Sequence, residues 1–405
     1  MKLPLLLLLP ASLFAADWPY FAGPTLDFHA DATAIGRDWK SAPPALLWKA
    51  PLSDNGHACA SCADGRIFIV DHEGTNDIAR AFALADGKEL WRHAYVDARK
   101  YYHGHARATP TVCEGRVYTV SQSGIVHCLD AATGRPVWKK EYLADLGGER
   151  PNHGYSAPVG VWGGLAYLQP GGKAGCVVAV NASTGEQVWR GGTPEKPGYS
   201  MPVITAFDKR PTLLCYSANT LMGLDPQTGS TLWTHPRTNS YGNNIMQPVV
   251  MGNRIFTGAT DFYGSVLVEV AAGKTREVWE SKEICPVFTA PVLANGVLIG
   301  TSSGKPANPE GLICFDPATG KVHWKVKAFE NDQVLAVDGV VLALDGQKGD
   351  LVMIDPGAEA YREITRFTPL GGRSWATFFT VGDRLLLRNQ RELACFKLGG
   401  KQAQP

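Results

Sequence analysis

One recurring position along the chain carries mostly side chains that bind ligands. The reference point in each unit is one residue within a short β-forming run, and in most units it is a proline. Each copy lies three positions before that reference residue. The copies are His57, Arg107, Tyr155, Tyr199, Ile245, Phe288, Asn331 and Trp375. Aromatic rings and imidazoles stack on planar groups, a guanidinium pairs with anions, and none of the eight is acidic. The set predicts a mouth that binds a planar or anionic ligand or a peptide. The structural alternative is that these residues bond one another and close the opening.

Neighbouring residues add imidazole, amide and guanidinium groups to the same predicted surface. They are His103, His105, His153, Asn243, Asn244 and Arg373. Two imidazoles two residues apart could share a metal ion with a third, but histidines without a carboxylate or thiolate make a poor site, so we expect no metal. No Ser-His-Asp arrangement or Gly-x-Ser-x-Gly elbow can be picked out, so we expect no catalytic residue.

A repeated phrase, Asp-x-x-Thr-Gly-x-x-x-Trp, must position these residues. Its best copies span 130–138, 181–189 (with Asn first), 225–233 and 316–324, and weaker copies end at Trp91 and Trp279. The repeat tryptophans are Trp48, Trp91, Trp138, Trp189, Trp233, Trp279 and Trp324, spaced 43, 47, 51, 44, 46 and 45 residues apart. A period of this length indicates a repeat architecture.

Each repeat unit reads as four short antiparallel strands. In one unit the runs 108–112, 116–120, 125–129 and 136–140 are rich in Val, Ile, Tyr and Thr and are separated by turn residues. In the phrase, the Asp or Asn side chain accepts backbone N–H groups and the glycine supplies a positive φ. Four strands per unit predict the blades of an all-β propeller, with the tryptophan on the outermost strand.

The count favours eight blades. Six units end at or near their own tryptophan, a seventh runs from about 331 to 367 without one, and an eighth begins near 375 with three strands. The strand 46–50 supplies the missing fourth, so that both chain ends close the ring. Seven blades is the alternative if 330–367 is an insertion. The expected organisation is a leader at 1–16, an extended segment at 17–43, the propeller at 44–398 and a flexible tail at 399–405.

The ends and the composition predict an exported protein. An apolar run at 3–9 followed by Phe14-Ala15-Ala16 is typical of a cleaved signal peptide, and no cysteine follows it to accept a lipid. No other apolar stretch approaches 18 residues, so no transmembrane segment is expected. The net charge of +1 argues against a nucleic-acid partner. We expect a soluble, monomeric protein that is periplasmic or secreted.

The nine cysteines are expected to be structural. Cys128, Cys314 and Cys395 occupy the same place in three units, far apart around a ring, so they are interpreted as buried small hydrophobic residues. Cys59 and Cys62 are spaced like a redox or metal motif, but residues three apart on a strand face opposite sides. We therefore interpret that pair as structural too.

The repeat resembles the pyrroloquinoline-quinone (PQQ) propeller repeat over roughly 44–398. The phrase from Leu129 to Trp138 reproduces the repeat core, and Asp17 to Pro24 looks like the start of exported PQQ-like propeller proteins. The resemblance implies one of two functions. One branch, the quinoprotein alcohol dehydrogenases, holds PQQ and Ca²⁺ at the mouth. The other is similar to BamB, a lipoprotein propeller that scaffolds outer-membrane β-barrel assembly.

The dehydrogenase branch implies a vicinal disulfide over the quinone, a tryptophan floor, oxygen ligands for calcium and a catalytic aspartate. This chain has no adjacent cysteines, and its predicted ring lacks a carboxylate. Trp375 could serve as the floor and Arg107 could meet a quinone carboxylate. We therefore expect a non-catalytic, exported scaffold that has no cofactor and binds a protein partner in the cell envelope. It differs from BamB-like lipoproteins in lacking a cysteine that could accept a lipid. The alternative is a PQQ- and calcium-dependent dehydrogenase-like enzyme, or a binder of PQQ or another small ligand at the mouth.

Overall fold

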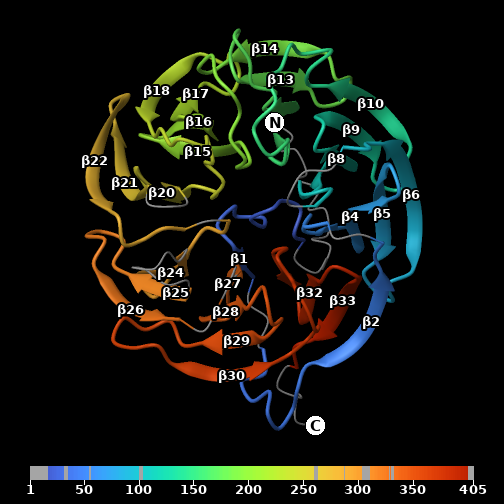
Figure 1. Cartoon of the computed structure of the whole chain (residues 1–405), viewed down its shortest axis with the longest axis vertical. Coiled ribbons are helices and arrows are strands. Elements are labelled where there is room, and N and C mark those ends of the chain that lie inside the picture. The colour runs from blue at the N-terminus through green and yellow to red at the C-terminus, as the bar shows by residue number, and fades with distance from the viewer. Residues whose placement is uncertain are drawn as a thin grey trace, which may run out of the picture.

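Each repeat unit folds into a blade of four antiparallel strands, and eight such blades stand around one axis in the computed structural model (Figure 1). The sheet of one blade gains a fifth, parallel strand from the N-terminal region. The structure describes residues 17–31, 35–53, 56–99, 104–259, 263–286, 288–302, 311–327, 329 and 333–399. Consecutive strands reverse direction, so their connections alternate between the two ends of the ring. The end formed by interblade links and second-to-third-strand hairpins is called the loop face, and the other end the turn face. The prediction of eight blades is confirmed, and the seven-blade alternative is wrong.

The first four blades follow one another along the chain. Blade 1 contains β3 (Ser61–Ala63), β4 (Arg66–Glu73), β5 (Asn76–Ala83) and β6 (Glu89–Val96). Blade 2 contains β7 (Thr111–Cys113), β8 (Arg116–Val120), β9 (Ile125–Asp130) and β10 (Pro136–Glu141). Blade 3 contains β11 (Gly160–Trp162), β12 (Leu165–Leu168), β13 (Val177–Asn181) and β14 (Gln187–Gly191). Blade 4 contains β15 (Val203–Phe207), β16 (Arg210–Tyr216), β17 (Thr220–Leu224) and β18 (Thr231–Pro236).

The remaining blades complete the ring. Blade 5 contains β19 (Val249–Met251), β20 (Arg254–Ala259), β21 (Gly264–Ala271) and β22 (Lys274–Ser281). Blade 6 contains β23 (Val292–Ala294), β24 (Val297–Ser302), β25 (Gly311–Phe315) and β26 (Val322–Val326). Blade 7 contains β27 (Gln333–Val337), β28 (Val340–Leu344), β29 (Leu351–Ile354) and β30 (Glu363–Phe367). Blade 8 contains β31 (Phe379–Val381), β32 (Arg384–Arg388), β33 (Glu392–Lys397) and β2 (Ala45–Pro51).

The ring is closed by strands from both ends of the chain. Strand β2 pairs antiparallel with β33, from Ala45 opposite Lys397 to Pro51 opposite Glu392. This confirms the closing strand expected at 46–50. Closure leaves blade 8 with four strands like the others, so the ring has no incomplete blade.

The repeat phrase acts through its turn. The carboxylate of Asp130 accepts hydrogen bonds from the backbone N–H groups of Ala132 (3.1 Å) and Thr133 (2.8 Å). Gly134 then adopts a φ of 70°, which a side chain would strain. The same carboxylate or amide contacts recur at Asn181, Asp225 and Asp316.

The repeat tryptophan joins its blade to the next one. The indole N–H of Trp138 donates to the Ala182 carbonyl (3.0 Å), and the indole lies so close to Gly185 that a Cβ there would sit 2.9 Å from it. Trp48, Trp91, Trp189 and Trp279 repeat this contact on Gly87, Gly134, Gly229 and Gly320. Glycine is therefore required at this position for two reasons: the turn needs a positive φ, and the indole of the preceding blade leaves no room for a Cβ.

Blade 7 lacks its own repeat tryptophan, and the N-terminal region supplies one. Trp39 is 2% exposed and packs edge-to-face on Phe367, with ring centroids 5.0 Å apart. Its backbone N–H donates to the hydroxyl of Thr365 in β30 (3.0 Å).

Residues 17–31, which we call the strap, cross the turn face near the ring axis (Figure 1). Trp18 and Cys62 exchange two backbone hydrogen bonds of 2.8 Å, and the Trp18 ring stacks on Phe379 at 5.5 Å. The Pro19 carbonyl accepts from Val112 N–H (2.9 Å). At its other end, β1 (His29–Ala30) pairs in parallel with β27. The strap thus joins several blades at this face.

The core consists of the apolar faces of neighbouring blades. Cys128, Cys314 and Cys395 are fully buried, as predicted, and all nine cysteines are unpaired. Cys59 and Cys62 are also buried. Within the described residues, no helix is long and apolar enough to span a membrane. The expected leader at 1–16 and the end of the tail at 400–405 lie outside the described residues.

Candidate functional site

The described ring positions lie in the interblade links at the loop face, directly before the innermost strands. His57 and Trp375 lie side by side, with ring centroids 5.1 Å apart. The guanidinium of Arg373 lies 4.3 Å over the Trp375 ring. All three side chains are half-buried. They form a stacked cluster where blades 8 and 1 meet.

A second contact chain links blades 2, 3 and 4. Arg107 donates to the backbone carbonyl of His153, and the N–H of His153 donates to the Tyr199 hydroxyl (3.2 Å). Burial and the nearby Arg107 charge together lower the pKa of His153. The predicted ring is therefore partly self-bonded, as the structural alternative required.

Two predicted binding residues lie inside the protein rather than on the mouth. Tyr155 is 3% exposed, donates to the Pro170 carbonyl (3.0 Å) and packs on Tyr142. Asn244 is fully buried. Neither side chain is available to a partner in this conformation, because the loops fold over both.

Asn244 instead holds the loops in place. Its amide nitrogen contacts three backbone carbonyls, those of Ser217 (2.9 Å), Ala218 (3.0 Å) and Arg237 (3.2 Å). Its oxygen accepts from Asn239 (2.9 Å). A buried amide with every polar atom engaged fixes the loops around it.

The remaining predicted residues do not come together. His105 stacks on His72 with ring centroids 3.5 Å apart, away from His153, which approaches Tyr199. Phe288 is 40% exposed. His103 and Asn331 lie outside the described residues. Among the residues that are described, His, Cys, Asp and Glu nowhere form a group of three that could hold a metal ion.

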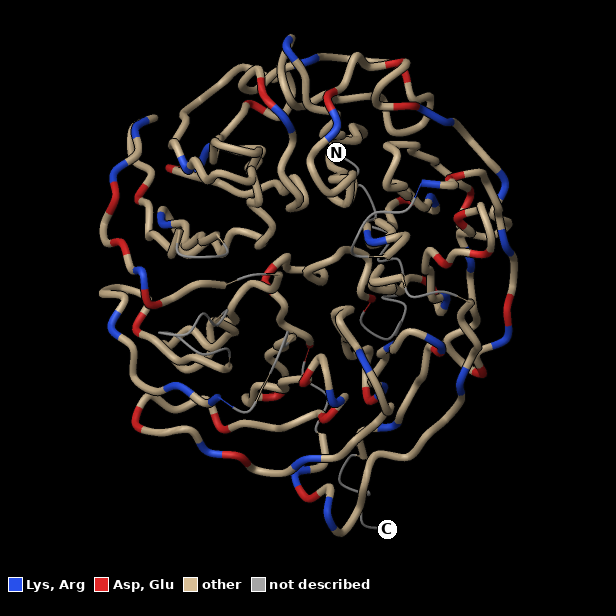
Figure 2. The backbone as a smooth tube through the Cα atoms, viewed as in Figure 1, with Lys and Arg blue, Asp and Glu red and all other residues tan. Residues whose placement is uncertain are grey.

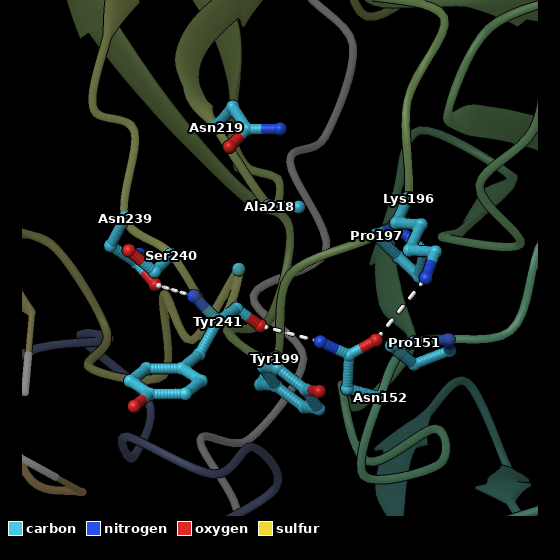
Figure 3. Close-up of a pocket in the computed structure, with 11 residues that line it drawn as sticks. Pro151, Asn152, Lys196, Pro197, Tyr199, Ala218, Asn219, Asn239, Ser240 and Tyr241 are labelled. Atoms are coloured by element: carbon cyan, nitrogen blue, oxygen red, sulfur yellow. Dashed lines mark hydrogen bonds between the residues drawn. The ribbon is translucent and has the colours of Figure 1, made fainter.

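A pocket of about 190 Å³ opens on the loop face over blades 3, 4 and 5 (Figure 3). Links before β11, β15 and β19 and the hairpin between β16 and β17 provide its walls. The lining residues are Pro151, Asn152, Lys196, Pro197, Tyr199, Ala218, Asn219, Asn239, Ser240, Tyr241 and Gly242. Amide, hydroxyl and ammonium groups dominate this lining, and it includes no carboxylate.

Hydrogen bonds between loops fix the shape of this pocket. Asn152 donates to the Tyr241 carbonyl (2.9 Å) and accepts from the Lys196 ammonium (3.1 Å) (Figure 3). Tyr241 N–H donates to the Asn239 side chain (3.2 Å). Tyr241 itself is 54% exposed. The pocket is therefore braced and polar, and it carries one exposed aromatic ring, Tyr241, and one cation, Lys196.

Sequence reasoning found only Tyr199 among these lining residues. Lys196 lies six residues before Pro202, and Tyr241 lies seven residues before Pro248. Neither occupies the position three residues before the proline, and the two links differ in length. The sequence Lys196-Pro197-Gly198 could have pointed to Lys196, because the Pro-Gly turn is rigid and fixes the position of the lysine beside it.

The described ring residues do not fit PQQ with calcium. None of them is a carboxylate, and calcium requires several oxygen ligands. The ring of Trp375, the floor that the resemblance offers, already packs against His57 and Arg373. Arg107, the group offered for a quinone carboxylate, donates to a backbone carbonyl.

Charge is spread evenly over the ring. Lys and Arg alternate with Asp and Glu along the outer strands (Figure 2), and many are paired, as Lys139 is with Glu141 at 2.7 Å. No single-sign face stands out in the described part of the chain.

Known proteins similar to this chain fall into two groups. The family model described as outer membrane protein assembly factor BamB matches residues 75–326. BamB of Shewanella oneidensis is 23% identical over 334 residues, covering 78% of this chain and 80% of that protein. Quinohemoprotein alcohol dehydrogenase ADH-IIG of Pseudomonas putida is 25% identical over 300 residues, covering 64% of this chain but only 38% of that enzyme.

The crystal structure of BamB from Moraxella catarrhalis matches with a TM-score of 0.62 and 16% identity, covering 89% of this chain and 99% of that chain. A likeness at this identity shows a shared fold. The family model, by contrast, spans more than half of the sequence. The chain therefore belongs to the PQQ-like propeller family whose model is described as outer membrane protein assembly factor BamB.

Proposed function

We propose that this protein is a non-catalytic scaffold of the cell envelope that holds an extended segment of a partner protein at the loop-face pocket. The observation that carries the proposal is the pocket wall. Its described residues provide side-chain amides, one ammonium group and one exposed tyrosine, and none of them is a carboxylate. This is the chemistry that recognises a peptide backbone and an acidic side chain.

Individual groups have distinct tasks in this proposal. The Asn219 side-chain amide makes no hydrogen bond with the described residues, so it can pair with a peptide group. Among the described residues, the Lys196 ammonium has a hydrogen bond only to a neutral amide oxygen, at Asn152, and it would attract an acidic side chain. Tyr241 supplies a ring that is 54% exposed for apolar contact.

The pocket is braced before any partner arrives. Asn244 ties together the hairpin of blade 4 and the link to blade 5. A preorganised site loses less conformational entropy on binding than a mobile one. The opposite end of the ring is crossed by the strap.

The relatives support the envelope setting. Several are named outer membrane protein assembly factor BamB. We extend this to the present chain as a proposal: an exported, monomeric protein that carries no cofactor and contacts an envelope protein.

A charge-reversal pull-down tests the proposal. The pocket variant Lys196→Glu/Tyr241→Ala should recover at least 10-fold less of the partner from an envelope extract than the unaltered protein. The matched control is Lys139→Glu/Val188→Ala, which changes one exposed lysine and one exposed apolar residue on the outer strands. The control should bind normally. Equal recovery by both variants would place the partner elsewhere.

A direct assay addresses the dehydrogenase alternative. PQQ with Ca²⁺ is added to the purified protein, and tryptophan fluorescence and alcohol-dependent dye reduction are followed. We expect no stoichiometric quenching and no dye reduction at micromolar PQQ. Saturable quenching with turnover would replace the scaffold proposal with an enzyme.

A further inference from the structure

The strap connects blades that are far apart around the ring. Backbone hydrogen bonds join Trp18 to Cys62 in blade 1 and Pro19 to Val112 in blade 2. At its far end Phe28 accepts from Ala336 in blade 7 (3.0 Å). The strap therefore covers the middle of the turn face, and its release would uncover the ends of several inner strands.

His29 ties the strap to blade 6, and both of its ring nitrogens face acceptors. Nε2 lies 2.7 Å from the Leu293 carbonyl oxygen of β23. Nδ1 lies 3.2 Å from the carbonyl oxygen of Asp27 and 3.3 Å from its carboxylate. Carbonyl and carboxylate oxygens cannot donate, so both nitrogens must carry hydrogen for both contacts to form. Only the imidazolium form can make both hydrogen bonds at once.

We propose that His29 is a proton-dependent latch: its doubly protonated ring holds the strap on the turn face, and loss of one ring proton weakens that hold. Neutral imidazole has only one N–H. In that form, the lone pair of the other ring nitrogen would face the lone pairs of an oxygen, and that contact would become repulsive. The inference concerns the turn face and is independent of the loop-face pocket.

The surroundings of His29 favour the charged ring. The hydrogen bond to Asp27 is the main cause that raises the pKa of His29, while burial opposes it. Asp27 is itself oriented by Thr25, whose hydroxyl donates at 2.5 Å, and by His29 N–H at 3.1 Å. Strands β23 and β27 carry no titratable side chain against the ring. Asp338, which follows β27, is engaged by Ile35 N–H and by Arg37.

The latch can exchange protons with solvent. The His29 side chain is 36% exposed and that of Asp27 is 44% exposed. Because the pKa of His29 is raised in the folded protein, the contribution of the latch is complete at acidic pH and disappears as pH rises through that raised value. The strap should therefore be held most firmly below about pH 6.

Amide hydrogen exchange of strap peptides, corrected for the intrinsic pH dependence of exchange, tests this. In the full-length protein, protection of residues 17–31 should fall at least 10-fold between pH 5.5 and 9, in one titration step. In His29→Gln it should be low and independent of pH. Uniform protection across this range, or an unchanged titration step in His29→Gln, would overturn the proposal.

Two further variants separate the latch from a general structural effect. Asp27→Asn should move the titration midpoint to lower pH while preserving the step, because the carboxylate that favours the imidazolium is gone. His323→Gln in β26 of the same blade changes a histidine remote from the strap and should leave the step unchanged. If Asp27→Asn leaves the pH midpoint of the exchange titration unchanged, the latch is contradicted even if His29→Gln folds poorly.

Discussion

Blades 1 and 4 carry the same outer-strand sequence, Trp-x-His, but among the described residues only the indole of blade 1 donates a hydrogen bond to the next blade. Trp91 donates to the Ala131 carbonyl (3.0 Å) and lies against Gly134. Trp233 is buried, yet its indole N–H has no hydrogen-bond partner among the described residues. A Cβ on Gly273, the equivalent glycine, would meet nothing closer than a carbonyl 3.6 Å away.

The cause lies in the following blade. Blade 5 joins β21 to β22 through two residues, Ala272 and Gly273, with φ of 49° and 71°. This tight hairpin is shorter than the Asp-x-x-Thr-Gly turn and leaves no carbonyl under the indole of blade 4. The hydrogen bond of the tryptophan therefore depends on the turn of the next blade as well as on the strand that carries the tryptophan.

The two seams are held in different ways. Between blades 4 and 5, Asn244 binds the loops at the opposite face, and His235 lies 3.3 Å from Glu277. Between blades 1 and 2, the seam contains His127, 4.3 Å from the Tyr95 ring. Four measurements test whether the two seams differ in this way.

The largest effect is expected at the loop-face amide. Asn244→Ala removes the partner of three buried carbonyls and should lower the free energy of unfolding by about 4 kcal/mol. Denaturant titration measures this. Asn243→Ala, one residue earlier, is the control and should cost under about 1 kcal/mol. Equal costs would mean that the amide network does not hold this seam.

The glycines of the two turns provide a matched pair. Gly134→Ala would place a Cβ 2.5 Å from the Trp91 ring at a φ of 70°, costing about 3 kcal/mol of unfolding free energy. Gly273→Ala has a similar φ of 71° and no ring nearby, so it should cost about 1 kcal/mol. Thermal and denaturant unfolding compare them. Similar losses would show that backbone strain alone, rather than the indole contact, explains the glycine.

Acid should weaken the seam of blades 1 and 2. Burial lowers the pKa of His127 to about 4, and His93 and Lys139 act in the same direction. The unfolded chain binds the proton near pH 6.5, so stability is full above that value and falls as pH decreases, by about 2 kcal/mol between pH 6.5 and 4.5. His127→Phe should flatten this slope when unfolding is measured across the range, whereas His323→Gln should not. An unchanged slope in His127→Phe would contradict the assignment.

The smallest difference is expected at the indole N–H groups. Trp91→Phe removes the indole hydrogen bond to the Ala131 carbonyl, whereas the Trp233 indole has no such bond among the described residues. Both substitutions remove a similar side-chain volume. Trp91→Phe should therefore be more destabilising by about 1 kcal/mol in chemical denaturation. A larger cost for Trp233→Phe would indicate that its indole finds an acceptor in solution.

The fold was predictable because each step is local. The contacts of Asp130 lie within three residues, and the strands alternate with turns that Gly134 and its equivalents specify. The closing strand was predictable because an eighth unit with three strands needed a fourth. The strap's path, and Trp39 filling the place of a missing repeat tryptophan, depend on contacts between distant residues and had no local signal.

The candidate site was predictable only in part. Counting back from the first-strand prolines selected Tyr199, which lines the loop-face pocket. The same count could not show that Tyr155 and Asn244 turn inward, because burial depends on how neighbouring loops fold over them. Lys196 and Tyr241 were missed because links of unequal length break the register.

The sequence by itself determined the blades, their number and the closure of the ring, because period, turn chemistry and strand patterning act within one repeat. Only the tertiary structure decided which mouth residues are buried, which loops form the pocket, and that the strap with His29 crosses the turn face. Those outcomes follow from contacts between blades, which no single repeat encodes.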